Sequence, residues 1–203
     1  MLDRHVAPRL KPLLHRGARA LHLRGWHADQ VTVAGFAIGL GAVVAVVLQA
    51  PVIALALLLL GRLADGLDGE LARLHGPSDA GAFLDITLDF VFYALFPVGF
   101  ALADPGANAL PAAVLVASFV GTGASFLAFA GQADRLGIER VQFAYKGLTY
   151  LDGLAEGTET IVAFALMCLF PAQFAMIAWA FAALCALTAV NRVVSGYRTL
   201  ADK

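Results

Sequence analysis

Residues 31–48 read VTVAGFAIGLGAVVAVVL, an uninterrupted apolar run without a single charged side chain. The hydrocarbon core of a bilayer needs about 20 such residues from one helical span. A strand of a membrane barrel would instead alternate apolar and polar residues, and this run does not. The stretch therefore predicts a helix that crosses a membrane.

The composition of the whole chain agrees with this stretch. Of the 203 residues, 60% are hydrophobic and 14% are charged, whereas a soluble domain has about 45–50% apolar and about 25% charged residues. These values exclude an ordinary soluble globule, and they exclude a disordered chain, which is poor in apolar residues. The net charge of −1 favours no polyanion, so we expect no nucleic-acid partner.

Five further stretches are long and apolar enough to be candidate spans: residues 51–72, 81–103, 107–130, 153–170 and 172–194. Proline marks the short connections at residues 50–51, 104–106 and 170–171, as is typical of tight turns between antiparallel helices. We expect an all-α integral membrane protein in which six transmembrane helices form one domain over residues 31–203.

The basic residues predict the orientation of these spans. All 14 lysines and arginines precede the first span, lie in or toward the loops after the second and fourth spans, or lie at or beyond the end of the sixth. The three short loops on the opposite side contain none. By the positive-inside rule, both termini and the charged loops lie on the cytoplasmic side of the inner membrane.

Residues 1–30 form a separate cytoplasmic segment in this interpretation. Apolar residues recur there at helical spacing with basic residues between them, which predicts an amphipathic helix at the membrane surface. Pro8 and Pro12 argue against one unbroken helix. A basic tail that only enforces the topology is the alternative.

Two pairs of aspartates stand near the cytoplasmic ends of the second and third spans. Asp65 and Asp68 are three residues apart, and Asp85 and Asp89 are four apart, so each pair shares one face of a helix. Antiparallel packing brings both pairs to a similar depth, and carboxylates inside a membrane usually mark function. The alternative, solvated helix ends, suits Asp79 and Glu70 but fits Asp89 poorly, because Asp89 stands about two turns inside the span.

Converging carboxylates repel one another strongly unless a cation or protons neutralise them. Oxygen ligands without nearby histidine or cysteine select hard ions such as Mg²⁺ or Mn²⁺, and four aspartates suit two ions about 3.5–4 Å apart. Gly69 and Ala72 would let a ligand approach the helix, and the planar guanidinium of Arg73 is suited to phosphate. The residues therefore predict metal-assisted phosphate chemistry.

This segment resembles the signature of the CDP-alcohol phosphatidyltransferase family. The pattern is Asp, two residues, Asp-Gly, two residues, Ala-Arg, a spacer, Gly, three residues, Asp, three residues, Asp. All eight fixed positions are present, at Asp65, Asp68, Gly69, Ala72, Arg73, Gly81, Asp85 and Asp89. The spacer from Leu74 to Ala80 has seven residues where the family usually has eight.

The resemblance implies a homodimeric membrane enzyme that transfers a phosphatidyl group from CDP-diacylglycerol to a small polar alcohol and releases CMP. It implies two Mg²⁺ or Mn²⁺ ions held by Asp65, Asp68, Asp85 and Asp89, with Asp89 also acting as the general base. The residues that it implies in nucleotide and diphosphate binding are Thr32, Asp65, Asp68, Gly69, Arg73 and Gly81.

The acceptor alcohol stays open. Arg140, Lys146 and Arg192 could bind a phosphate on the acceptor, as in glycerol 3-phosphate or inositol phosphate, or could serve only the topology. Glu156 and Glu159 share a face at the start of the fifth span and could bind hydroxyls or pair with these cations. Inositol, serine, choline and phosphatidylglycerol are further candidates, and a CDP-linked headgroup could instead be the donor.

Two other function classes compete with the enzyme. A carboxylate-lined cation or proton transporter also carries clustered acids inside the membrane, but it does not explain Gly69, Ala72 and Arg73 at these spacings. A lipid-binding protein without catalysis would not need four aspartates. CMP production from CDP-diacylglycerol separates the three classes.

Overall fold

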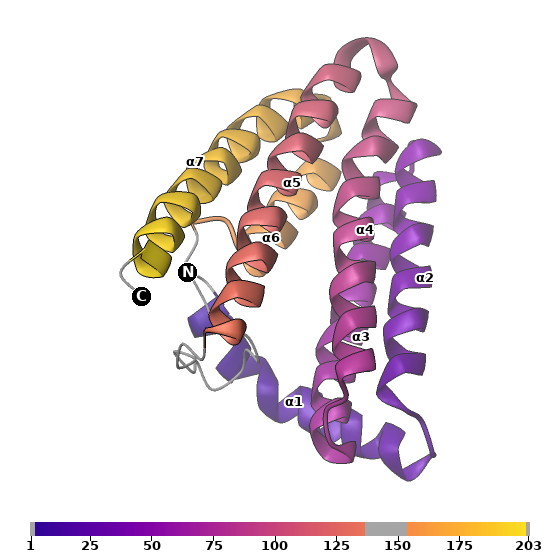
Figure 1. Cartoon of the computed structure of the whole chain (residues 1–203). Helices are drawn as coiled ribbons and strands as arrows, with labels where there is room; N and C mark the ends of the chain where they lie inside the picture. Colours follow the sequence, from indigo (N-terminus) through magenta and orange to yellow (C-terminus); the bar gives the residue numbers. More distant parts are fainter. Residues whose placement is uncertain (1–2, 137–153, 202–203) are drawn as a thin grey trace.

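The structure, a computed structural model, describes residues 3–136 and 154–201, and short turns connect the helices that make up nearly all of these ranges (Figure 1). The helices are α1 (Asp3–Leu23), α2 (Ala28–Val47), α3 (Pro51–His75), α4 (Asp79–Ala103), α5 (Pro105–Arg135), α6 (Gly157–Leu169), the short 3₁₀ helix η1 (Pro171–Gln173) and α7 (Phe174–Ala201). The expectation of an all-α protein is confirmed.

Six of the helices, α2 to α7, coincide with the six predicted spans. Within the described residues, four helices are long and apolar enough to cross a membrane: α2, α4, α5 and α7 taken together with η1. Charged residues crowd the second half of α3, and the 13 residues of α6 extend over about 20 Å. The number of spans therefore stays a prediction.

Proline, glycine and serine mark the start of α3 and the turn between α3 and α4. Pro51 occupies the first turn of α3, where its missing N–H costs no hydrogen bond. Gly76 follows α3 with a φ of 92°, which glycine adopts without strain. The side-chain oxygen of Ser78 then accepts the N–H of Gly81 at 3.0 Å and caps α4. Because residues along a helix keep a fixed angular spacing, the position at which α4 begins also decides which of its residues face α3.

Helix α2 packs against both α3 and α4 and holds them in place. A Cβ atom at Gly35 would lie 3.0 Å from the Cβ of Ala64, and one at Gly61 would lie 3.3 Å from the carbonyl oxygen of Gly35. On the other side, a Cβ at Gly39 would lie 2.9 Å from the ring of Phe92. Glycine thus allows α2 to approach both neighbours closely.

Aromatic side chains connect α4 to the C-terminal half of the bundle. The rings of Phe96 and Phe164 stack with centroids 4.4 Å apart, and those of Phe100 and Phe174 stack at 4.5 Å. Each such pair contributes about 0.5–1.5 kcal/mol beyond the burial of its area. This core fixes α4 relative to α6 and α7.

Helix α1 differs from the expectation, because it is one continuous helix that includes Pro8 and Pro12. It packs against α3, with Ala18 fully buried beside Leu71 and with Leu14 close to Gly66. Burial of this apolar face offsets the two hydrogen bonds that the prolines cannot donate. In Figure 1, α1 lies across the end of the bundle where α3 ends and α4 begins.

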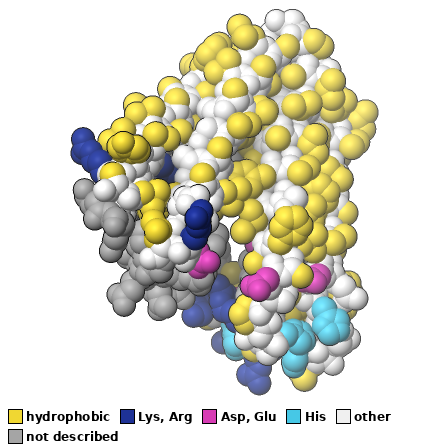
Figure 2. Space-filling view, viewed as in Figure 1, with side chains coloured by type: hydrophobic (Ala, Val, Ile, Leu, Met, Phe, Trp, Pro, Cys, Tyr) yellow, Lys and Arg dark blue, Asp and Glu magenta, His cyan; other side chains and the backbone are white. Residues whose placement is uncertain are grey.

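The surface shows a division that suits a bilayer. In Figure 2 hydrophobic side chains cover the upper part of the visible face, and acidic, basic and histidine side chains gather mainly in its lower half. Exposed leucines and valines are frequent on α2, α3, α5 and α7. Such an apolar surface is stable in lipid and unfavourable in water.

Candidate active site

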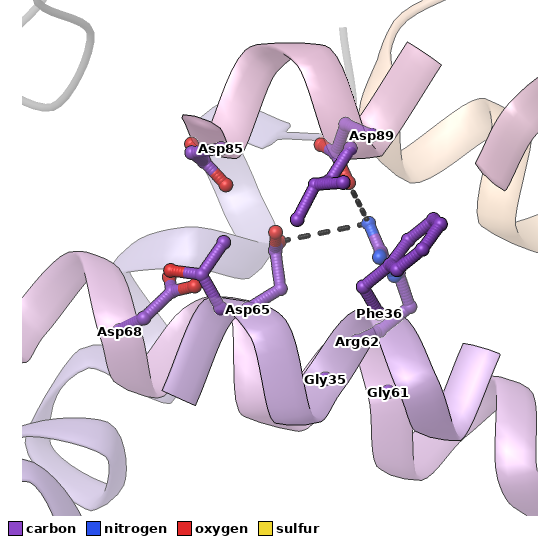
Figure 3. A pocket seen from close by; sticks show the side chains of 10 residues that line it. Gly35, Phe36, Gly61, Arg62, Asp65, Asp68, Asp85 and Asp89 are labelled. Atoms are coloured by element: carbon purple, nitrogen blue, oxygen red, sulfur yellow. Dashed lines mark hydrogen bonds and ion pairs between the residues drawn. The ribbon is translucent and has the colours of Figure 1, made fainter. Parts of the chain in front are cut away.

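A pocket lies between the second half of α3 and the first half of α4, with α2 forming its third side (Figure 3). All four motif aspartates line it, as their helical spacing predicts. The full lining is Thr32, Gly35, Phe36, Gly61, Arg62, Asp65, Asp68, Asp85, Leu88 and Asp89. The close packing of α2 at its glycines places Thr32 and Phe36 beside the carboxylates.

Three of the aspartates form a compact set of oxygen atoms. Asp65, Asp68 and Asp85 each offer one carboxylate oxygen, and these oxygens lie within 4.8 Å of one another. Asp68 is only 5% exposed, and its Oδ2 atom is buried without a hydrogen-bond partner. A buried polar atom without a partner is costly, and the described residues leave this one oxygen of Asp68 unsatisfied.

The fourth aspartate is paired with a cation that the sequence analysis counted only toward topology. Nη1 of Arg62 donates a hydrogen bond to Oδ1 of Asp89 at 2.8 Å and lies 3.7 Å from Oδ2 of Asp65. The side chain of Arg62 is 15% exposed and projects into the pocket (Figure 3). Its position three residues before Asp65 was the one available signal, because it places both side chains on one face.

The structure brings only some of the expected nucleotide residues together. Thr32 lines the pocket, and its hydroxyl donates to the carbonyl of Ala28 at 3.1 Å. Gly69, Arg73 and Gly81 are not among the lining residues. A Cβ atom at Gly69 would meet nothing within 4 Å, so packing within the described chain does not require glycine there.

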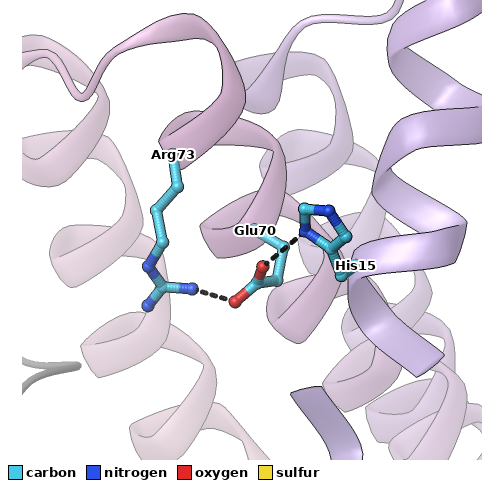
Figure 4. Close-up of polar contacts among 3 residues, drawn as sticks. All are labelled: His15, Glu70 and Arg73. Carbon is cyan, nitrogen blue, oxygen red and sulfur yellow. Dashed lines mark hydrogen bonds and ion pairs between the residues drawn. The ribbon is translucent and has the colours of Figure 1, made fainter. Parts of the chain in front are cut away.

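Arg73 instead forms an ion pair with Glu70, one turn earlier on α3 (Figure 4). The other oxygen of Glu70 lies 3.4 Å from Nδ1 of His15 on α1. Glu70 is 5% exposed, so the interpretation of this residue as a solvated helix end is wrong. The packing of α1 on α3 buries it, and sequence spacing within α3 alone does not reveal that contact.

A second pocket shares α4 with the first one. It has about 660 Å³ of empty volume against about 250 Å³ for the first. Phe90 and Tyr93 line it from α4, Glu156 from the start of α6 and Arg192 from α7. Nη1 of the buried Arg192 donates to the carbonyl oxygen of Thr122 at 3.2 Å.

The remaining expected acceptor residues are placed differently. Glu159 lies in the first turn of α6 and is partly buried, but it is not among the residues that line this second pocket. Arg140 and Lys146 lie outside the described residues, so their predicted role stays untested.

Comparison with known proteins identifies the class to which this site belongs. The family model for CDP-alcohol phosphatidyltransferases matches residues 26–190, which include α2 to α6 and most of α7. The chain belongs to the CDP-alcohol phosphatidyltransferase family. It is thus an enzyme of this class, and family membership decides against the transporter and the non-catalytic lipid-binding protein.

Two relatives of this CDP-alcohol phosphatidyltransferase differ in how much of the chain they match. The inner membrane protein YnjF of Escherichia coli is 54% identical over 200 residues, 98% of this chain and 97% of the relative. The archaetidylinositol phosphate synthase of Pyrococcus horikoshii is 38% identical over 98 residues, 48% of this chain and 52% of the relative.

Solved structures show the same fold. The Mycobacterium tuberculosis phosphatidylinositol phosphate synthase PgsA1 with CDP-DAG bound superposes with a TM-score of 0.72 at 19% identity, over 92% of this chain and 94% of that one. The same enzyme in complex with manganese and citrate gives a TM-score of 0.69 at 21% identity, over 91% and 88%. These likenesses support the helical arrangement described above.

Proposed function

We propose that this enzyme transfers a phosphatidyl group from CDP-diacylglycerol to the hydroxyl of a small polar alcohol and releases CMP. The observation that carries the proposal is the pocket in which all four motif aspartates meet. Relatives support the choice of substrates, since one structural neighbour has CDP-DAG bound and one sequence relative is an archaetidylinositol phosphate synthase.

The carboxylates of this pocket fit a divalent metal. Their donor set consists of oxygen atoms alone, which favours Mg²⁺ or Mn²⁺, and the buried Oδ2 of Asp68 has no partner within the described residues. Asp65, Asp68 and Asp85 would hold a first ion, and Asp89 would share in holding a second. The metal would neutralise the diphosphate of the donor while that group reacts.

Asp89 is the residue that we propose as general base. It lines the pocket on α4, about one helical turn beyond Asp85, and one of its oxygens is engaged by Arg62. The other carboxylate oxygen would accept the proton of the acceptor hydroxyl as that oxygen attacks the phosphorus bearing diacylglycerol. The bond from this phosphorus to the CMP oxygen breaks, and CMP leaves with the bonding electrons.

The remaining motif residues would bind the nucleotide end of the donor. Thr32 stands at the pocket wall beside Asp65 and Asp68. The open space at Gly69 leaves its helix face accessible to a ligand, and Gly81 lies in the first turn of α4. Arg73 is half-exposed near the end of α3, where its guanidinium would meet a phosphate group arriving from solvent.

The second pocket is the site that we propose for the acceptor. The two pockets share helix α4 as a wall. Asp89 of this helix lines the first pocket, and the neighbouring Phe90 and Tyr93 line the second. Arg192 offers a guanidinium fork suited to a phosphate, and Glu156 offers oxygens suited to hydroxyls. Arg140, Lys146 and Glu159 remain candidates for the same role. These features favour a phosphorylated alcohol such as glycerol 3-phosphate or inositol phosphate.

The placement of the enzyme in the membrane is part of the proposal. We place the protein in the inner membrane with six spans and with both termini and the active site on the cytoplasmic side. The inner membrane location of YnjF and the apolar face in Figure 2 support the membrane location, and the distribution of the basic residues supports the orientation. Residues 1–30 would form the interfacial segment and residues 31–203 the catalytic domain. A homodimer stays a prediction from the family resemblance.

The function is tested by product analysis with purified protein in detergent. Radiolabelled CDP-diacylglycerol is offered with Mg²⁺ or Mn²⁺ and with each candidate alcohol in turn, and lipid products and CMP are resolved by chromatography. We expect CMP and one phosphatidyl alcohol in equal amounts with one acceptor, and neither in the presence of EDTA.

A parallel set of reactions offers CDP-linked headgroups with diacylglycerol as the lipid acceptor. CMP formation only in this set would reverse the direction of transfer that we propose. If CDP-diacylglycerol yields no acceptor-dependent CMP with either ion, the proposed function is wrong.

The acceptor pocket gives a separate prediction. Arg192→Gln should raise the KM for a phosphorylated acceptor about 10- to 100-fold, because a charge-assisted hydrogen bond to phosphate contributes about 1.5–3 kcal/mol. The KM for CDP-diacylglycerol should change little. Steady-state kinetics with each substrate varied in turn measure both values.

Two further variants control this experiment. Arg192→Lys keeps the positive charge and should recover part of the acceptor affinity, and Arg198→Gln removes an exposed arginine from the same helix. Equal effects of Arg192→Gln and Arg198→Gln on the acceptor KM would contradict the placement of the acceptor phosphate at Arg192.

A further inference from the structure

Arg62 occupies a position in the carboxylate pocket that the motif of the family resemblance does not include. It reaches from α3 across to α4, where Nη1 donates to Oδ1 of Asp89 at 2.8 Å. The same nitrogen lies 3.7 Å from Asp65 on its own helix. Arg62 thus touches two of the four carboxylates while leaving Asp68 and Asp85 without a direct contact to it among the ion pairs of the described residues.

Helix α4 holds the guanidinium of Arg62 in a fixed place. The guanidinium carbon lies 5.1 Å from the ring centroid of Phe92 and 5.8 Å from that of Tyr93. These residues follow Asp89 by three and four positions, so the ion pair and both ring contacts come from one face of α4. Cation–π contacts at a partly desolvated site add to the ion pair, and a lysine would not reproduce this planar arrangement.

The arginine divides the carboxylates into two groups. The oxygens of Asp65, Asp68 and Asp85 cluster within 4.8 Å, and that cluster does not include Asp89. Asp89 directs Oδ1 toward Arg62 instead (Figure 3). The first group has the donor set of a metal site, whereas the second is a carboxylate oriented by a fixed cation.

We propose that Arg62 is a positioning residue that holds the Asp89 carboxylate in place for proton acceptance and, through its own charge, weakens the binding of cations in the pocket. The inference rests on the proposed function, because it assigns a partner to the base of that reaction. The charge of Arg62 also lies within the same pocket as the metal-binding aspartates. Its removal makes the pocket more negative by one charge, which favours divalent cations.

The test compares Arg62→Gln with Arg62→Lys and with Arg198→Gln, which removes an exposed arginine that is not part of the pocket lining. Mn²⁺ binding to the purified protein without substrates is measured by electron paramagnetic resonance, and kcat and KM are measured from CMP release. We expect Arg62→Gln to bind Mn²⁺ about tenfold more tightly and to lose about 100-fold in kcat. The KM for CDP-diacylglycerol should stay close to that of the wild type.

Arg62→Lys keeps the charge but loses the planar fork and its contact with both rings. It should bind Mn²⁺ as the wild type does and retain a kcat between those of the wild type and Arg62→Gln. Thermal unfolding shows whether each variant is folded. If Arg62→Gln does not fold, the turnover rate of Arg62→Lys decides the test. In Arg62→Gln the affinity for Mn²⁺ should rise while kcat falls. General damage to the fold would instead lower both the affinity and kcat.

The inference is overturned if Arg62→Gln binds Mn²⁺ no more tightly than the wild type, or if Arg62→Lys turns over at the full wild-type rate. Failure of the proposed function looks different. In that case the wild type itself releases no CMP from CDP-diacylglycerol, while the tighter Mn²⁺ binding of Arg62→Gln would still be observed.

Discussion

Replacing Asp89 by asparagine should lower the rate of CMP release by about 10²- to 10⁴-fold, the usual contribution of a general base. The amide keeps the shape of the side chain, and its oxygen can still accept the hydrogen bond that Arg62 donates to Oδ1. It cannot accept a proton from the acceptor hydroxyl. We therefore expect a folded protein that binds CDP-diacylglycerol but barely turns over.

Single-turnover release of CMP from the bound donor measures this effect most directly. Asp79→Asn is a matched control, because Asp79 is an exposed acid at the start of the same helix and does not line the pocket. Thermal unfolding of both variants tests the fold. Full activity of Asp89→Asn would remove the assignment of Asp89 as the base.

The second large effect is expected for Asp68→Asn. This substitution should stabilise the metal-free protein and weaken its binding of the metal. In EDTA, Asp68→Asn should raise the midpoint of thermal unfolding by about 2–4 °C for each kcal/mol gained. The substitution removes a buried carboxylate whose Oδ2 has no partner among the described residues and lies among other carboxylates. The N–H groups of the new amide can donate to these neighbours.

In Mn²⁺ the order should reverse. A metal present at about 100 times its dissociation constant stabilises the wild type by about 2.7 kcal/mol, and Asp68→Asn should gain much less because one ligand is lost. CMP release should fall with metal affinity. Unfolding curves recorded with and without Mn²⁺ measure both effects, and Asp79→Asn again serves as the control. An Mn²⁺-induced rise in Asp68→Asn equal to that of the wild type would contradict the assignment of Asp68 as a ligand.

The helices could be located from sequence because membrane spans are marked by the absence of charge. Residues 31–48 correspond closely to α2 at Ala28–Val47, and residues 81–103 correspond to α4 at Asp79–Ala103. Two helices extend beyond the predicted spans that end at residues 130 and 194, since α5 continues to Arg135 and α7 to Ala201. Hydropathy marks the part of a helix that suits lipid, whereas the backbone hydrogen bonds continue beyond it.

The shared pocket of the four aspartates was predictable because it depends on short spacings within two helices joined by one turn. Arg62 and Glu70 were not, since each finds its partner on another helix: Asp89 on α4 and His15 on α1. A positive charge near a cytoplasmic loop also has a sufficient explanation in topology. The continuity of α1 through Pro8 and Pro12 likewise depends on tertiary packing, which outweighs local propensity.

The two pockets that share α4 have a consequence for how members of such a family diverge. Side chains of α5, α6 and α7 can be exchanged around the larger cavity while the residues of α2 and α3 beside the carboxylates stay unchanged. A new headgroup preference could then evolve without rebuilding the chemical step. With the acceptor placed as proposed, selection for one lipid product over another acts on a lining that shares no residue with that of the carboxylate pocket.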